Sequence, residues 1–284
     1  MERTLLVGGE LPGILTTAGL PRIGLVALHP AGGPSRDFPL IRHLAAALPP
    51  HGVAVLRYDR RPPRAPDGDV SLRVQVADAI TAIADLRAAT SPGLPIVLWG
   101  FSQGAWAALL AAHEVAVAGV AVVGACGVTP ADQMRYMTAR QIRHDGFGDD
   151  AVAELLETRR VWEAALQGGS ADEADRVLRH ASRQPWFSLA WLPDEVEPIS
   201  PDDFEFFFDP APAIRTLPCP LLAIIGDDDT CVPLPESIAV LETAPEVSFL
   251  HVPGGDHAPT TDGQGEGEVL PGYEAGLIDW IGRL

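Results

Sequence analysis

Residues 98–104 read LWGFSQG and place Ser102 between Gly100 and Gly104. An apolar run typical of a β-strand comes directly before this segment, and an alanine-rich run typical of a helix comes directly after it. A serine at a sharp strand-to-helix turn, with glycine two positions away on each side, is the pattern of a nucleophile elbow. The segment therefore predicts a strand at 95–99, a nucleophilic serine at 102 and a helix at 105–113.

The two glycines have a steric reason. Because the chain must reverse within a few residues, side chains two positions on either side of the serine would collide, and glycine removes the Cβ atoms concerned. The turn imposes strained backbone angles on Ser102 and lifts its side chain above the sheet. A serine hydroxyl is a weak nucleophile unless a base lies beside it and donors await the oxyanion. The elbow thus predicts partner residues elsewhere in the chain.

Apolar runs alternate with helical patterns on both sides of the elbow. The run at 70–90 is the longest helical pattern, with apolar residues at one-turn spacing. Further helices are expected at 38–48 and 273–284, and strands at 4–7, 11–16, 24–28, 53–58, 117–123, 221–225 and 247–252. This β-α-β-α order predicts a mostly parallel sheet with helices on both faces.

The alternation breaks shortly after the strand at 117–123. Residues 133–192 are helical and charged and show no strand pattern, with the clearest helices at 149–166 and 171–182. A segment of this length is too long for a plain loop. We therefore expect an α/β core formed by residues 1–132 and 215–284, interrupted by a helical cap or lid at 133–214.

Charge and hydropathy exclude several classes of partner. The 284 residues carry a formal net charge of −18, which argues against nucleic acid or anionic lipid because both require a basic surface. The chain lacks an apolar run of about 18 residues, and its start lacks the pattern of a signal peptide. We expect a cytoplasmic protein that binds neither nucleic acid nor membrane; the sequence leaves the oligomeric state open, with a homodimer as one option.

Three cysteines, at 126, 219 and 231, lie in apolar runs and form no C-x-x-C pair. This usage is typical of reduced, buried thiols and not of disulfides or metal ligands. The sequence predicts neither a metal ion nor a cofactor.

An acid and a histidine should follow the nucleophile in chain order. His257 is the best candidate for the histidine because it lies in a glycine-rich loop after the last strand, and catalytic groups of parallel sheets gather at the carboxyl ends of the strands. His29 is its main rival, and an alternative role for it is to order the loop that follows it. Spacing alone leaves the acid open among three consecutive residues after the strand at 221–225, Asp227, Asp228 and Asp229, with Asp132 a weaker alternative.

The oxyanion hole needs two backbone N–H groups, one from the residue after the nucleophile and one from the loop after an early strand. Gln103 supplies the first. The second should come from the loop at 29–33, HPAGG, and since Pro30 has no N–H group we assign it to Ala31.

These segments together resemble the α/β-hydrolase superfamily. The segment 29–33 is similar to the family's H-G-x-G-G loop, with proline in place of the first glycine, and 57–61, RYDRR, resembles its Y-D-x-R-G run without the last glycine. The segment 225–233, IGDDDTCVP, resembles the G-x-x-D-x-x-V-P stretch that carries the acid, and 253–257, PGGDH, resembles the histidine loop. The resemblance selects Asp229 as the acid and implies an α/β-hydrolase fold with a mostly parallel eight-stranded sheet. The proline-containing segments 209–212, DPAP, and 218–221, PCPL, resemble those of esterases and acyl peptidases of the dienelactone-hydrolase or prolyl-oligopeptidase-like branch.

The function expected from these features is a serine hydrolase that cleaves a carboxylic ester or thioester of a small, largely apolar molecule through an acyl-serine intermediate. The alternative is non-hydrolytic chemistry on the same fold, such as acyl transfer, acyl elimination or cyclisation of a natural-product intermediate. In the insertion, Met134, Met137, Trp186 and Trp191 are candidates for an apolar substrate pocket. A peptidase is less favoured, because the chain has no propeller or other additional domain to admit peptides.

Overall fold

Eight strands form one sheet in the order β1-β2-β4-β3-β5-β6-β7-β8 in the computed structural model, which describes residues 1–32, 35–62, 70–196 and 206–284. Strand β2 runs antiparallel to both of its neighbours, and every other neighbouring pair is parallel. The strands are β1 (Glu2–Val7), β2 (Leu11–Thr16), β3 (Ile23–Leu28), β4 (Val53–Tyr58), β5 (Ile96–Phe101), β6 (Gly119–Val123), β7 (Leu221–Gly226) and β8 (Val247–Val252). The predicted α/β architecture with a mostly parallel eight-stranded sheet is confirmed.

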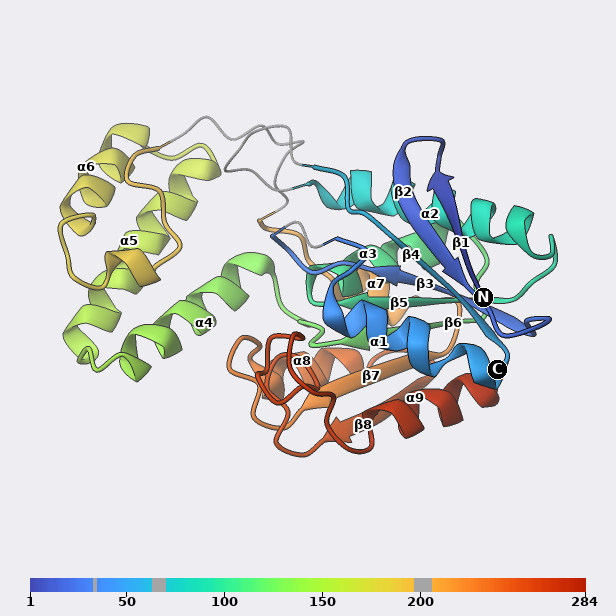
Figure 1. Ribbon diagram of the computed structural model, residues 1–284. Helices are drawn as coiled ribbons and strands as arrows, with labels where there is room; N and C mark the ends of the chain where they lie inside the picture. The colour runs from blue at the N-terminus through green and yellow to red at the C-terminus, as the bar shows by residue number, and fades with distance from the viewer. Residues whose placement is uncertain (33–34, 63–69, 197–205) are drawn as a thin grey trace.

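Helices cover both faces of the sheet (Figure 1). The α-helices are α1 (Pro39–Ala47), α2 (Leu72–Ala89), α3 (Gln103–Glu114), α4 (Pro130–His144), α5 (Asp149–Leu166), α6 (Ala171–Ala181), α7 (Ala211–Arg215), α8 (Leu234–Leu241) and α9 (Tyr273–Gly282). Two short 3-10 turns, at Pro49–His51 and Phe187–Leu189, complete the described elements. None of these helices combines the length and apolar character needed to cross a membrane.

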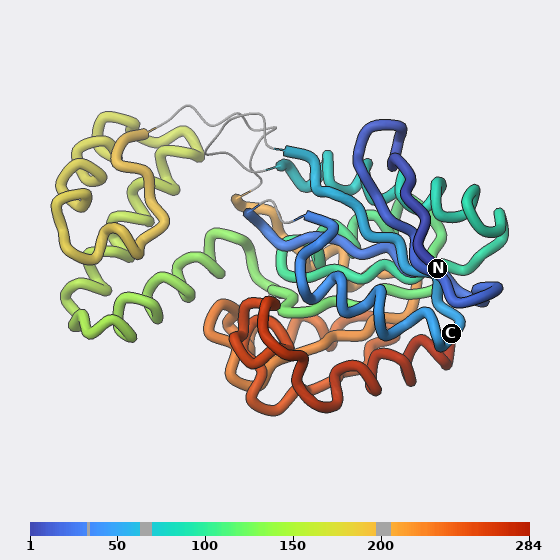
Figure 2. Tube along the Cα trace, viewed as in Figure 1, coloured from blue at the N-terminus to red at the C-terminus, as the bar shows by residue number. Residues whose placement is uncertain are grey.

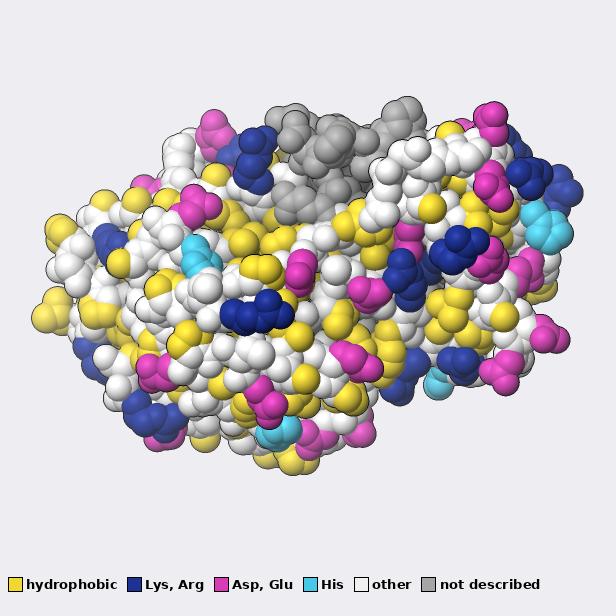
Figure 3. Space-filling model, turned by 180° about the vertical axis from the view of Figure 1, so that it is seen from behind, with side chains coloured by type: hydrophobic (Ala, Val, Ile, Leu, Met, Phe, Trp, Pro, Cys, Tyr) yellow, Lys and Arg dark blue, Asp and Glu magenta, His cyan; other side chains and the backbone are white. Residues whose placement is uncertain are grey.

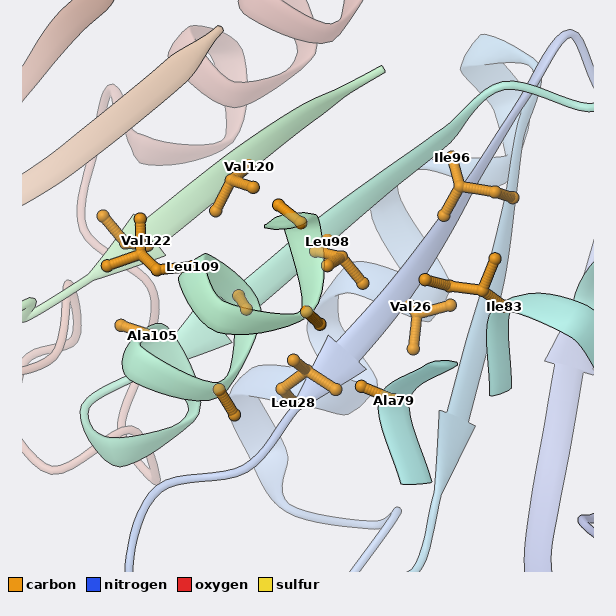
Figure 4. Packing of buried hydrophobic residues seen from close by; sticks show 14 of the residues in the cluster. Val26, Leu28, Ala79, Ile83, Ile96, Leu98, Ala105, Leu109, Val120 and Val122 are labelled. Atoms are coloured by element: carbon orange, nitrogen blue, oxygen red, sulfur yellow. The ribbon is translucent and has the colours of Figure 1, made fainter. Parts of the chain in front are cut away.

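Strand β5 shows how the core is divided between the two faces. Its side chains alternate, so Ile96 and Leu98 join the cluster under α2 and α3, while Val97 and Trp99 join the cluster under α1 and α9. Figure 4 shows the first cluster, in which residues of β3, β5 and β6 pack against α2 and α3. Each fully buried aliphatic side chain contributes about 1.5–3 kcal/mol relative to an exposed one. Every residue of β5 is buried, so the strand that leads to the predicted nucleophile is firmly packed on both faces.

Helices α4, α5 and α6 form a lobe inserted between β6 and β7, and the lobe lies to one side of the sheet in Figures 1 and 2. It has a core of its own, in which Ile142, Leu155 and Trp186 are almost fully buried. The first of these helices begins at Pro130, three residues before the predicted boundary. At the other boundary, Ile214 of α7 packs in the core under the sheet, so the end of the predicted insertion lies with the α/β core.

The net acidic charge is spread over the surface. On the face drawn in Figure 3, acidic and basic side chains are interspersed. Arg160 with Glu157 and Arg179 with Asp175 are two ion pairs on the helical lobe, and the partners of each pair are spaced by about one helical turn. Ion pairs at the surface contribute little to stability, because water and salt screen them.

Candidate active site

Ser102 occupies the apex of the turn between β5 and α3. Its backbone angles, φ 53° and ψ −118°, lie in a region that side chains other than glycine rarely adopt. Its backbone N–H donates to the carbonyl of Val123 at the end of β6, at 2.9 Å, which holds the strained residue at the carboxyl edge of the sheet. A Cβ atom at Gly100 would lie 2.2 Å from the carbonyl oxygen of Gly104, and one at Gly104 would lie 2.6 Å from that of His29. The glycines at both positions are thus sterically required, as the motif predicts.

The acid candidates separate clearly in space. Asp229 is 2% exposed, and its Oδ2 lies 3.1 Å from Nδ1 of His257. Its Oδ1 accepts from the backbone N–H groups of Cys231 and Val232, at 2.8 and 2.9 Å. Asp227, in contrast, pairs with the exposed His251 on β8. Of the acids that spacing left open, the structure brings Asp229 to the histidine.

The loop that carries His257 is tied to the loop that carries the acid. Asp256 accepts from the backbone N–H and from the hydroxyl of Thr230, at 2.6 and 2.9 Å. A Cβ atom at Gly226 would lie 2.0 Å from the carbonyl oxygen of Asp256, so the two loops touch through their backbones. This backbone contact, together with the hydrogen bonds of Asp256, fixes His257 relative to Asp229.

Gly124 is a residue of the site that the sequence interpretation missed. It follows β6 with φ 56°, and a Cβ atom there would lie 2.6 Å from the carbonyl oxygen of His257 and 2.9 Å from two atoms of its ring. The His257 ring also packs against Phe101, with ring centroids 5.2 Å apart. Phe101 directly precedes the serine, so the histidine lies beside the elbow. The available signal was a glycine at the carboxyl end of a predicted strand.

The hydrogen bond to Asp229 determines the state of the His257 ring. An ionised carboxylate only accepts hydrogen bonds, so Nδ1 carries the proton and Nε2 keeps a lone pair. Among the described residues, no hydrogen bond joins Ser102 to His257. Such contacts are often long in enzymes without substrate and tighten in the substrate complex. The arrangement can take a proton at Nε2 and stabilise the resulting imidazolium through Asp229.

His29, the rival histidine, has a structural place. It is 3% exposed, and its Nε2 lies 2.6 Å from the carbonyl oxygen of Tyr58 on β4. Burial lowers the pKa of His29 to about 4. The ring is therefore neutral near pH 7 and donates from Nε2 to that carbonyl, which anchors the start of the loop at 29–32. This is the loop-ordering role considered for it from the sequence.

The two predicted oxyanion donors lie at different kinds of position. Gln103 opens α3, so its backbone N–H is at a helix N-terminus, where the helix dipole favours negative charge. Its side-chain oxygen accepts from Arg60 and from Gln75, the latter at 3.0 Å, and both of these donors are buried. Ala31 is exposed in the loop after β3. Gly33, which ends the predicted loop motif, lies outside the described residues.

The four predicted substrate-binding residues lie in the helical lobe, but they differ in how far they are exposed. Met134 packs against the cluster that contains Trp162 and Leu178, and Met137 is half-buried on α4. Trp191 is 72% exposed and has a positive φ of 52°. Trp186 is only 2% exposed within the lobe's own core, so its side chain packs there and presents no surface to a ligand.

Comparison with known proteins agrees with this geometry. A model of the alpha/beta hydrolase family matches residues 25–266, which is most of the chain. The chain belongs to the alpha/beta hydrolase family. No curated protein gives a significant sequence match to it.

Solved structures of the same fold include a peptidase and esterases. The proline iminopeptidase of Mycobacterium smegmatis is 15% identical, with a TM-score of 0.58, and the match covers 100% of this chain and 98% of that one. An esterase of Pyrococcus furiosus is 16% identical, with a TM-score of 0.59 and coverage of 100% and 90%. A thermophilic esterase of Thermogutta terrifontis is 18% identical, with a TM-score of 0.56 and coverage of 100% and 98%. At these identities the similarity establishes a shared fold.

Proposed function

We propose that this alpha/beta hydrolase is a serine hydrolase that cleaves a carboxylic ester or thioester of a small, largely apolar molecule through an acyl-serine intermediate. The observation that carries the proposal is the hydrogen-bonded pair of Asp229 and His257, held beside the strand whose end presents Ser102 in a strained turn. Nucleophile, base and orienting acid are the minimum set for acyl transfer through serine. Membership of the family supports the same class of reaction.

The roles of the residues in this mechanism are as follows. Nε2 of His257 takes the proton of the Ser102 hydroxyl as the serine oxygen attacks the carbonyl carbon, and later gives that proton to the leaving group. Asp229 holds the imidazole in the required tautomer and stabilises its charged form. The N–H groups of Gln103 and Ala31 bind the oxyanion, and the loss of one such donor typically costs about 10²–10³ in rate. Water then attacks the acyl-serine, with His257 acting as base again.

Substrate selection belongs to the helical lobe in this proposal. The lobe is inserted directly after β6, whose carboxyl end binds the backbone of Ser102, so a cap built from α4, α5 and α6 would border the site. Met134, Met137 and the exposed Trp191 remain the candidates for contact with an apolar acyl or ring group. Because Trp186 is enclosed by its own lobe, its contribution would be to hold the lobe's shape.

The test combines active-site labelling with a substrate panel. A fluorophosphonate probe should label the wild-type protein at Ser102, and the Ser102→Ala variant should lose both the label and all burst release from p-nitrophenyl esters. Labelling of another residue in that variant would overturn the assignment of the nucleophile. A series of p-nitrophenyl esters of increasing acyl length, with proline p-nitroanilide alongside, would separate esterase from peptidase activity. Mass spectrometry of the products would show whether water or another acceptor ends the reaction.

A further inference from the structure

A third side chain capable of binding metal lies beside Asp229 and His257. In the described part of the chain, one group of at least three potential ligands comes together: a carboxylate oxygen of Asp229, the Sγ atom of Cys231 and a ring nitrogen of His257, all within 4.8 Å of one another. The proposed hydrolytic mechanism uses the first and the last of these residues, and it leaves the thiol without a role. The Cys231 thiol therefore has no function in the proposed hydrolysis, although it lies beside the catalytic pair.

The backbone of Cys231 is held in position by the acid itself. Its N–H donates to Oδ1 of Asp229 at 2.8 Å, so the thiol starts from a fixed Cα only two residues beyond the carboxylate. The residue is partly exposed and forms no disulfide. A dissolved ion can reach such a thiol more readily than a fully buried one, such as that of Cys126.

The electrostatic setting favours a cation, because the carboxylates of Asp229 and Asp256 act on the Cys231 thiol and attract a positive ion there. Binding of a divalent cation would displace the thiol proton to water and leave a thiolate neutralised by the ion.

The spacing suits a small tetrahedral ion. Zinc binds sulfur at about 2.3 Å and nitrogen or oxygen at about 2.0–2.1 Å, so its ligands lie roughly 3.3–3.6 Å from one another. Asp229 Oδ2 and His257 Nδ1 are already 3.1 Å apart, and the Cys231 sulfur lies within 4.8 Å of a ligand atom of each residue. Thiolate, imidazole and carboxylate form a ligand set that zinc accepts, with water in the fourth position.

We propose that Asp229, Cys231 and His257 form a reversible inhibitory site for zinc or a similar thiophilic divalent cation. The ion takes the lone pair of one ring nitrogen of His257 and a carboxylate oxygen of Asp229, and one proton leaves from the thiol. Occupancy of either ring nitrogen ends the ability of His257 to take the Ser102 proton while Asp229 orients the ring. The inhibitory consequence depends on the function proposed above, whereas the binding of the ion does not.

Calorimetric titration with zinc chloride tests the binding directly. The wild-type protein should bind one ion and release one proton, which is measured by repeating the titration in buffers with different heats of ionisation. The Cys231→Ser and Cys231→Ala variants should bind zinc at least about 100-fold more weakly, since each lacks one of three direct ligands. Cys219→Ser is the matched control, because this partly exposed thiol lies outside the cluster and its loss should leave the affinity unchanged. Equal affinity in the wild-type protein and in both folded Cys231 variants would overturn the site.

Inhibition is measured separately on an ester substrate. Zinc should inhibit the wild-type protein and Cys219→Ser, and a chelator should restore activity, whereas Cys231→Ser should keep its basal rate and resist zinc. Magnesium at the same concentration should have no effect, because it prefers oxygen ligands over sulfur. Binding that depends on Cys231 but leaves hydrolysis intact would overturn the inhibitory role and the assignment of His257 as base. A protein that hydrolyses no ester would contradict the proposed function, while the titration would still decide the metal site.

Discussion

Gly124 provides the sharpest test of how the histidine is positioned. Replacement by alanine adds a single methyl group at a residue with φ 56°, where a Cβ atom would lie 2.6 Å from the carbonyl oxygen of His257 and 2.9 Å from its ring. Ordinary contacts between such atoms are about 3.5 Å or longer, so His257 must shift by roughly 0.6–0.9 Å. Gly124→Ala therefore displaces the proposed base without changing any group that takes part in the reaction.

The expected effect on rate follows from that displacement. A misplacement of about 1 Å between reacting groups can cost about 10²-fold in rate, which corresponds to about 3 kcal/mol of activation free energy. We expect kcat/KM of Gly124→Ala on a p-nitrophenyl ester to fall by about that factor. The rate of fluorophosphonate labelling at Ser102 should fall with it, because activation of the serine needs the same base. The left-handed backbone conformation costs about 1–2 kcal/mol of folding stability in addition.

Gly9→Ala is the matched control. Gly9 lies in the turn between β1 and β2 with φ 76°, and a Cβ atom there meets no atom within 4 Å. This variant should lose a similar amount of stability in chemical denaturation and keep the wild-type kcat/KM. If folded Gly124→Ala retained kcat/KM within about threefold of wild type, the inference that the site depends on this close approach would be refuted.

Three further substitutions test the surroundings of the site. Asp229→Asn should lower kcat by about 10⁴-fold in ester hydrolysis, because an amide no longer favours the required tautomer, whereas a loss of that size in Asp227→Asn would contradict the choice of acid. Arg60→Met removes a charged donor to the Gln103 side chain, and steady-state kinetics should show kcat falling about 10-fold with KM little changed; an unchanged kcat would show that the Gln103 side chain needs no anchor. His29 has a folded-state pKa of about 4, below its unfolded value of about 6.5, so the unfolded state binds a proton first as the pH falls. Wild type should therefore lose about 2 kcal/mol more unfolding free energy than His29→Gln between pH 7 and pH 4.5, and equal losses in urea titrations would contradict the burial argument.

The elements that carry the site could be predicted because their signals are local. The strands at 53–58 and 247–252 and the helix at 149–166 have the bounds predicted from their patterns. The elbow needs only glycine spacing and a strand-to-helix change, and both are visible within a few residues. Helices α7 and α8 escaped prediction because they are short, at five and eight residues, and proline-containing.

The choice among three consecutive aspartates could not be made from spacing, since it depends on a turn. The backbone N–H of Asp229 donates to the carbonyl of Gly226, which turns the chain back over the end of β7. In the register of β7 and β8, Ile225 pairs with His251, so Asp227 emerges beside that exposed histidine. The strand register and the turn after β7 therefore decide which acid faces His257. Neither can be read from the sequence composition.

Buried charges were equally hidden from the sequence pattern. Asp78 has the appearance of a solvent-facing polar residue on the helix at 70–90, yet it is 9% exposed and accepts two hydrogen bonds from Arg61. Its partner comes from the segment after β4, 17 residues earlier in the chain. Periodicity records which face of a helix is apolar, but it does not record a long-range ion pair that makes a charged residue acceptable on the buried side.

The site is assembled mainly through close backbone approaches. At Gly104, Gly124 and Gly226, a Cβ atom would lie within 3 Å of a backbone atom from another segment of the site. Such contacts tolerate almost no substitution, so the relative placement of Ser102 and His257 is built into the core and is independent of which substrate is used. The helical lobe has its own separate core, so its surface can change without disturbing that placement. Differences in substrate preference among proteins of this architecture should therefore map to the lobe, and exchange of lobe residues should alter acyl-chain preference while the labelling chemistry of Ser102 is kept.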